Sequence, residues 1–278
     1  MRFIFRIIFI PICFFGISCE PGDGALIDLP ELKTKYVVES YLMPGESPRF
    51  LITHTDGFIK DYDINSQDND ISTEMVEGVV GALYINGESH EVVNKHLEYE
   101  GKFYNYQVSG VDSLGQNDVL ELELTFPTGE KVYSKSRVPE LIEIDSIAFN
   151  KSENRYGDVL YITFDKPETQ YVRRILLRVR GKYTQLIQDL PVSGSLSNNG
   201  KMVFGSEMDF RRGDTVISRI YSINKEYYDY YNSIFMNLQS NTNPFVQPGQ
   251  ISGNIVGSDK VVGIFTAMQM ADSLVVVK

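Results

Sequence analysis

From Lys35 onward the chain is a series of short runs rich in β-branched and aromatic residues, and Gly, Pro, Asn or Asp separates each run from the next. The clearest run is 119–126, where leucines alternate with acidic residues, so that a strand built from it has one apolar face and one acidic face. Runs of this length and spacing are typical of β-sandwiches and not of alternating strand and helix units. The pattern therefore predicts a mostly β protein.

Turn signals join several of these runs into hairpins. Pro44-Gly45 separates the runs 36–42 and 49–54, and Asn86-Gly87 separates 79–85 from 88–93. Asn-Gly is the strongest short hairpin signal, because both central residues of a type I′ turn need positive φ. Further strands are expected at 119–126, 131–138, 144–149, 159–164, 171–179, 183–188, 201–204 and 215–223, and one or two closing strands within 261–267 and 273–277.

The period of the pattern changes in 224–238. Apolar side chains recur there at intervals of three and four residues, which places them on one face of an α-helix. Ser222 or Asn224 would supply the N-cap, and Glu226 falls in the first turn, where the helix dipole favours an acid. The residues on the expected apolar face are Tyr227, Tyr231, Ile234, Phe235 and Leu238.

We expect two β-sandwich-like domains, the first Ig-like or fibronectin-like at 35–139 and the second at 140–278 with the single helix near 224–238. Between the second and third strands, 56–77 is dense in Asp, Asn, Ser and Gln, which predicts a long polar loop. The acids of this loop do not have the spacing of a calcium-binding loop, so we expect solvated side chains and no metal. These acids are Asp61, Asp63, Asp68 and Asp70.

The first residues read as a targeting segment. Arg2 and Arg6 precede a short apolar run that ends in Gly16-Ile17-Ser18-Cys19. A small residue directly before Cys is the pattern of a bacterial lipoprotein signal, which predicts a signal peptide at 1–18 and lipidation of Cys19. The segment 19–34 then reads as a flexible, acidic tether, and two or three acyl chains would give a lasting membrane anchor.

The composition excludes some functions and offers no catalytic constellation. The formal net charge of −11 argues against nucleic acid as a partner. His90 and His96 would point to the same face of a strand but lie roughly 20 Å apart, too far for one zinc ion. Once Cys19 is acylated, no thiol nucleophile remains. We expect no catalytic residues, no metal and no cofactor, and a hydrolase that uses two carboxylates remains an alternative.

Two side-chain clusters stand out. The tyrosines of the expected helix would occupy two of its faces, so part of this set is a candidate interaction surface, with core packing as the alternative. The basic run from Arg173 to Lys182 alternates with apolar residues and reads as a solvated strand face. The candidate interaction surface comprises Tyr227, Tyr228, Tyr230 and Tyr231.

Seven segments in order carry a family resemblance. They follow the lipoprotein Cys and comprise Ile27 to Pro30, Tyr36 to Leu42, Gly81 to Ile85, Ile144 to Ile147, Ser222 to Tyr228, Asn243 to Phe245 and Gly263 to Phe265. On these residues the chain resembles the domain-of-unknown-function family DUF4249 of Bacteroidetes outer-membrane lipoproteins. Its segment Gly257 to Lys260 departs from a stretch that tends to be glycine-rich in the family.

The resemblance implies an accessory role at the outer membrane. Genes of the family tend to lie beside TonB-dependent receptors of the SusC type, and the family has no established catalytic residues. We therefore expect a non-catalytic binding lipoprotein, held on the cell-surface side of the outer membrane by its N-terminal lipid, whose partner is such a receptor. An adhesin or envelope-scaffold protein that binds other proteins without transport is the alternative.

Overall fold

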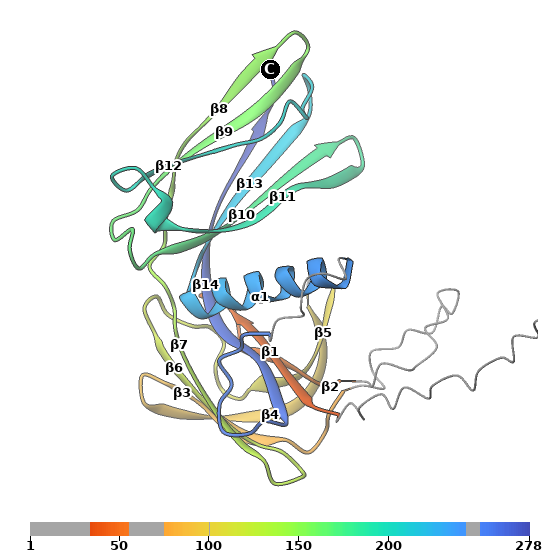
Figure 1. Ribbon diagram of the computed structural model, residues 1–278. Coiled ribbons are helices and arrows are strands. Elements are labelled where there is room, and N and C mark those ends of the chain that lie inside the picture. The colour runs from red at the N-terminus through yellow and green to blue at the C-terminus, as the bar shows by residue number, and fades with distance from the viewer. Residues whose placement is uncertain (1–33, 56–74, 100, 243–250) are drawn as a thin grey trace, which may run out of the picture. The chain divides into compact units, whose positions relative to one another are not determined.

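A computed structural model describes residues 34–55, 75–99, 101–242 and 251–278 of the chain. The protein is mostly β with one α-helix in these ranges, as predicted (Figure 1). The strands are β1 (Tyr36–Leu42), β2 (Arg49–His54), β3 (Val80–Ile85), β4 (Glu88–Tyr99), β5 (Lys102–Val108), β6 (Val119–Thr125), β7 (Lys131–Arg137), β8 (Ile144–Ser152), β9 (Arg155–Thr163), β10 (Tyr171–Arg180), β11 (Tyr183–Ser193), β12 (Lys201–Gly205), β13 (Thr215–Ile223) and β14 (Val261–Val276). The helix is α1 (Lys225–Thr242), and a short 3₁₀ helix occupies Gly194–Leu196.

Two sheets contain all of these strands. The larger has the order β11-β10-β13-β14-β1-β2-β5-β4-β3-β6-β7, and the smaller has the order β12-β9-β8. The two closing strands foreseen at the C-terminal end are one strand, β14, which pairs in parallel with β1 over its first half and antiparallel with β13 over its second half (Figure 1). Hydrogen bonding therefore continues across the predicted boundary near residue 139, and the division into two domains stays a prediction.

The first seven strands and the start of β14 enclose one apolar cluster. Along β1, Tyr36, Val38 and Leu42 are buried in it, because alternate side chains of a strand point to the same face. The sheet returns on itself where the segment before β14 pairs with β7: the Tyr133 N–H donates to the Val256 carbonyl at 2.8 Å. Asn254 extends this link, because its side-chain amide exchanges two hydrogen bonds with the backbone of Phe265.

The small sheet covers one face of the strands around β10 and β13. Apolar residues of β9 and β12 pack there against Val172 and Ile220, and a further cluster forms around Leu176 and Phe210. One ion pair also crosses this interior, between Asp158 of β9 and Arg174 of β10, and both side chains are fully buried. This region therefore has a charged interior as well as an apolar one.

The helix α1 crosses the opposite face of the large sheet and contacts β10, β11 and β14 (Figure 1). Tyr227 is buried there together with Ile223 and Met268, and further tyrosines pack around them. Asn224 directly precedes the helix, and its side-chain amide donates to the carbonyls of Arg137 and Ala267. The start of the helix is thereby fixed to the end of β7 and to the middle of β14.

Several local predictions are confirmed. Asn86 and Gly87 have φ of 53° and 88°, as a type I′ turn requires, and β1 pairs antiparallel with β2. Ser222 is not the N-cap, because it lies in β13 and its hydroxyl accepts a hydrogen bond from the Ile142 N–H. Strand β5 was not predicted. The signal peptide 1–18, most of the tether 19–34, and loop residues 56–74 with their four aspartates lie outside the described residues.

Candidate functional site

A cavity of about 790 Å³ lies between α1 and the face of the large sheet that the helix covers. Strands β1, β2, β10, β13 and β14 contribute to its wall, and the ends of β4 and β5 border it. Aromatic side chains form nearly half of its lining, together with aliphatic residues and a few charged groups. The aromatic lining residues are Tyr41, Tyr99, Phe103, Tyr104, Tyr221, Tyr227, Tyr230, Tyr231 and Phe235.

Strand alternation decides which side chains reach this cavity. Along β1 the core takes Val38 and Ser40, so Glu39 and Tyr41 face α1. Along β10 the interior takes Val172 and Arg174, which leaves Arg173 on the cavity face. In each strand, the residues that face the cavity are thus the sequence neighbours of those that face the core.

The four helix tyrosines proposed as an interaction surface are buried or half-buried. Tyr227 and Tyr230 are 4% and 7% exposed, and Tyr228 and Tyr231 are half-buried. The Tyr227 ring meets Tyr41 edge-on at 5.9 Å between centroids. Phe235, which the sequence pattern placed on the buried face, is 52% exposed, because it lies toward the solvent side of the helix with Met236 at 56%. The role of the four tyrosines in binding a partner stays a prediction.

Arg173 is held rigidly at one wall of the cavity. Its guanidinium makes two hydrogen bonds of 2.6 Å to the carboxylate of Asp189, and it donates a third to the Tyr227 hydroxyl. Burial acts to lower the pKa of Arg173, but the hydrogen bonds to Asp189 and the electrostatic effects of Asp189, Tyr227 and Tyr231 together outweigh it and raise the pKa. Burial also raises the pKa of Tyr227 to about 12, so the phenol is neutral at physiological pH.

Glu39 is the carboxylate that faces the cavity from β1. Burial raises its pKa above the ordinary value, against the opposing effects of a hydrogen bond from Tyr230 and the charge of Lys102. The Tyr230 hydroxyl donates to the Glu39 carboxylate at 3.5 Å, and burial raises the pKa of Tyr230 to about 12. Burial raises the pKa of Tyr41 as well. The phenols of the site are therefore neutral, and the Glu39 carboxylate accepts only a long, weak hydrogen bond from a described residue.

A second carboxylate, Glu46, also lines the cavity, but it forms an ion pair of 2.5 Å with Arg49. The Arg49 guanidinium stacks on the Tyr99 ring at 3.6 Å from its centroid, and this cation–π contact helps to hold the arginine in place. Apolar walls with a small number of placed polar groups are the usual composition of a small-molecule site, and 790 Å³ is within the usual size. The arrangement can bind an amphipathic ligand.

The basic run of β10 is not the solvated face that its pattern indicated. Arg174 is fully buried with Asp158, and Arg173 is held by Asp189, because these two neighbours point to opposite faces that are both covered. Only the end of the strand behaves as expected: the Arg180 side chain is 43% exposed and pairs with Asp214 through two hydrogen bonds.

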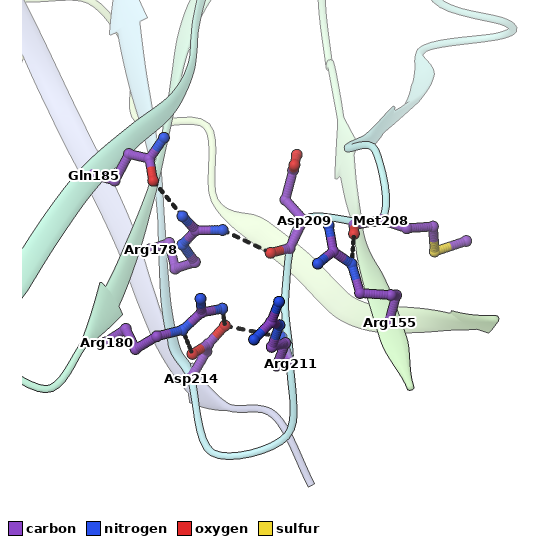
Figure 2. Close-up of polar contacts among 8 residues, drawn as sticks. All are labelled: Arg155, Arg178, Arg180, Gln185, Met208, Asp209, Arg211 and Asp214. Carbon is purple, nitrogen blue, oxygen red and sulfur yellow. Dashed lines mark hydrogen bonds and ion pairs between the residues drawn. The ribbon is translucent and has the colours of Figure 1, made fainter. Parts of the chain in front are cut away.

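The exposed arginines gather around the loop before β13. Figure 2 shows Arg178 between the Gln185 side chain and the Asp209 carbonyl, and Arg180 on the carboxylate of Asp214. Asp214 also accepts a hydrogen bond from the Arg211 N–H at 2.8 Å. The hydrogen bonds from Arg180 lower the pKa of Asp214. These contacts hold the loop 206–214 against β10.

The remaining predictions concern lipidation, metal binding and the membrane. Cys19, the candidate lipidation site, lies outside the described residues. Within the described ranges, no group of three or more His, Cys, Asp or Glu side chains is arranged to hold a metal ion. Nor does any helix in those ranges have the length and apolar character needed to cross a bilayer. The cavity could not be predicted from the sequence because its walls come from seven separate strands and the helix.

The comparisons with known proteins identify a family and little else. The family model described as "Domain of unknown function (DUF4249)" matches residues 25–273. No curated protein matches the chain. Similar solved structures include dimeric latent PorU from Porphyromonas gingivalis (11% identity, TM-score 0.21) and the Fcho1 Mu homology domain of Danio rerio with a bound Eps15 peptide (10% identity, TM-score 0.20).

CBD12 from CALX1.2 is a third such structure, at 9% identity and a TM-score of 0.16. The matches cover 69%, 86% and 86% of this chain, and 18%, 92% and 100% of PorU, the Fcho1 domain and CBD12 respectively. The chain thus spans less than a fifth of PorU. With TM-scores this low, none of the three likenesses bears on the fold or on the function.

Proposed function

We propose that this chain, which belongs to the family described as a domain of unknown function (DUF4249), is a lipid-anchored binding protein of the outer membrane. It would lie on the cell-surface side, bind a small ligand without chemical conversion, and serve a TonB-dependent uptake receptor. The observation that carries the binding role is the aromatic cavity of about 790 Å³ beneath α1.

The composition of the cavity supports binding over catalysis. Arg173 is bound to Asp189, and Glu46 to Arg49, so these charged groups have fixed partners within the protein. The buried phenols are neutral, since the pKa of Tyr227 and of Tyr230 is raised to about 12. A rigid aromatic wall gives a ligand a large contact area at a small cost in side-chain entropy.

The sequence supports the anchor. Gly16-Ile17-Ser18-Cys19 follows a short apolar run with two arginines before it, as expected of a lipoprotein signal. The receptor partnership rests on the family resemblance alone. Both parts can be tested on one strain that produces the tagged, full-length protein.

The test is purification of the native tagged protein from outer membranes in mild detergent, with quantitative mass spectrometry of the proteins that copurify. We expect one TonB-dependent receptor in near-equal amount. The Cys19→Ala variant should lose membrane association, and Cys13→Ala, which lies within the predicted signal peptide, is the matched control. Recovery of the lipoprotein alone at low salt would contradict the receptor partnership.

A protein-docking role without transport is the second candidate, and exposed apolar side chains favour it. On the face of the large sheet beyond α1, Leu274 is 64% exposed and Val276 is 47% exposed on β14, and Leu186 is 53% exposed on β11. Exposed apolar patches are typical of protein contacts. An adhesin or scaffold would retain a protein partner that is not a receptor, and variants of the cavity would leave that partner bound.

A further inference from the structure

The charged groups of the cavity fall into two kinds. Arg173 and Glu46 are each engaged with a partner of opposite charge from the protein itself, Asp189 and Arg49. A ligand that approached these two would have to break an ion pair. They shape the cavity, and their charges are already balanced.

Glu39 and Lys102 are different. Neither forms an ion pair within the part of the chain that the structure describes, although both line the cavity. The only hydrogen bond to the Glu39 carboxylate from a described residue is the long one of 3.5 Å from the Tyr230 hydroxyl. The Lys102 ammonium lies 6.0 Å from the centre of the Tyr41 ring. The cavity therefore presents one spare carboxylate and one spare ammonium, next to the same tyrosine.

The two groups differ in their exposure to solvent. Glu39 is half-buried on the central strand β1, beneath α1, whereas Lys102 is exposed at the start of β5. The charge of Lys102 offsets only part of the effect of burial on Glu39, so a cationic group placed against Glu39 gains more than an anionic group placed against solvated Lys102. The geometry gives a ligand a direction, with its ammonium inside and its carboxylate at the mouth.

The same cavity also has apolar lining residues. Tyr41, Met43 and Met268 line the space together with Ile234 and Phe235 of α1. Methionine side chains adapt to varied shapes, which suits a site that accepts more than one apolar side chain. A neutral sugar or a hydrocarbon would leave the Glu39 carboxylate desolvated without a partner.

We propose that the ligand is a short zwitterionic peptide with apolar side chains, whose ammonium binds Glu39 and whose carboxylate faces Lys102. This inference rests on the proposed function, because it names the ligand of the same cavity. It adds that the protein recognises both charged ends of the ligand, and that the ammonium at Glu39 contributes more to affinity than the carboxylate at Lys102.

The test uses the purified, full-length-expressed protein in lipid nanodiscs, with empty nanodiscs as the blank, and isothermal titration calorimetry. The probes are the dipeptide Leu-Phe, its N-acetyl form, its C-terminal amide, the doubly blocked peptide, and maltotriose as a neutral sugar. N-acetylation should weaken binding about tenfold or more, because it removes a charged hydrogen bond to a half-buried group. Amidation should weaken binding by only about threefold, as for an exposed pair.

Variants separate the two ends. Glu39→Gln should bind Leu-Phe and N-acetyl-Leu-Phe within about twofold of each other. Lys102→Met should bind Leu-Phe and its amide within about twofold of each other, and because Lys102 is exposed we expect the variant to fold. Glu91→Gln and Lys95→Met, exposed on β4 and away from the cavity, are the matched controls and should retain the full discrimination.

Three results would overturn the inference. Equal affinity for all four peptides would mean that the protein does not recognise the charged termini of the ligand. Binding of maltotriose without binding of Leu-Phe would assign the cavity to sugars and leave the proposed function standing. Copurification of the receptor together with no binding of any peptide would reject this ligand class alone, whereas loss of the receptor together with tight, charge-dependent binding of Leu-Phe would reject the partnership and keep the ligand.

Discussion

Strands β1–β7, with the start of β14, enclose one continuous apolar cluster, whereas β8–β13 divide their interior between smaller clusters and a buried ion pair. In the first region, the buried Asn105 side chain is satisfied by the backbone of Ile52 and Val76. In the second, Asp158 Oδ2 and Arg174 Nε have no hydrogen-bond partner among the described residues. Burying a charge adds a desolvation cost that burying leucine does not. The two regions should therefore respond differently to core substitutions.

The largest expected effect is in the apolar core of the first region. Phe50 of β2 and Phe265 of β14 are fully buried and stack at 6.2 Å between centroids. Phe50→Ala should lower the free energy of unfolding by about 3–5 kcal/mol, through lost burial and a cavity. Urea unfolding followed by circular dichroism measures this. Phe103→Ala, at a side chain that is 51% exposed, is the control, and an equal loss there would contradict the distinction.

The second largest effect is expected at the buried ion pair between Asp158 and Arg174. Asp158→Asn removes the negative charge opposite the buried Arg174 guanidinium, whose other side-chain partner is the neutral Gln188 oxygen at 3.0 Å. We expect a loss of about 3 kcal/mol in unfolding free energy, at the lower end of the range for a broken buried pair. The double variant Asp158→Leu with Arg174→Met should unfold within about 1 kcal/mol of the parent, or be more stable. A large loss in the double variant would show that the pair contributes net stability.

The cavity wall is predicted to respond less. Tyr227→Phe removes the hydroxyl that accepts a hydrogen bond from Arg173 and keeps the ring that packs on Tyr41. The expected loss is about 1 kcal/mol of unfolding free energy, typical of one hydrogen bond. Tyr228→Phe, at a half-buried ring beside Tyr171, should change it by less. Similar losses for the two variants would argue against a specific role for the Arg173–Tyr227 contact.

The smallest effect, and one that depends on pH, is expected at the exposed end of β10. Because hydrogen bonds from Arg180 lower the pKa of Asp214, this pair adds stability that is present above the unfolded pKa of about 3.9 and is lost as pH falls through the folded value. Arg180→Gln should therefore destabilise the protein slightly at pH 7 and hardly at all in strong acid. Thermal melts across pH 2–7 measure this, with Arg212→Gln as the control. A loss of equal size at every pH would contradict the linkage.

Much of the fold follows from local patterns. The alternation in 119–126 and the Asn86-Gly87 turn specify their own backbone, because side-chain period and positive φ are properties of a few consecutive residues. The helix period in 224–238 was likewise sufficient, and the helix continues to Thr242. Strand β5 escaped notice because its tyrosines and Asn105 do not alternate in polarity; Asn105 and Tyr106 are both buried.

The sequence by itself determined the strand and helix types, the family and the expected lipid anchor, since each is written in neighbouring residues. Tertiary structure alone decided that β1 pairs with β14, that Arg174 lies inside while Arg173 lines a cavity, and that Glu39 meets α1. A run of alternating residues fixes which side chains share a face. It does not fix what covers that face, because burial depends on elements far apart in the chain, and burial sets the charge state and the binding chemistry.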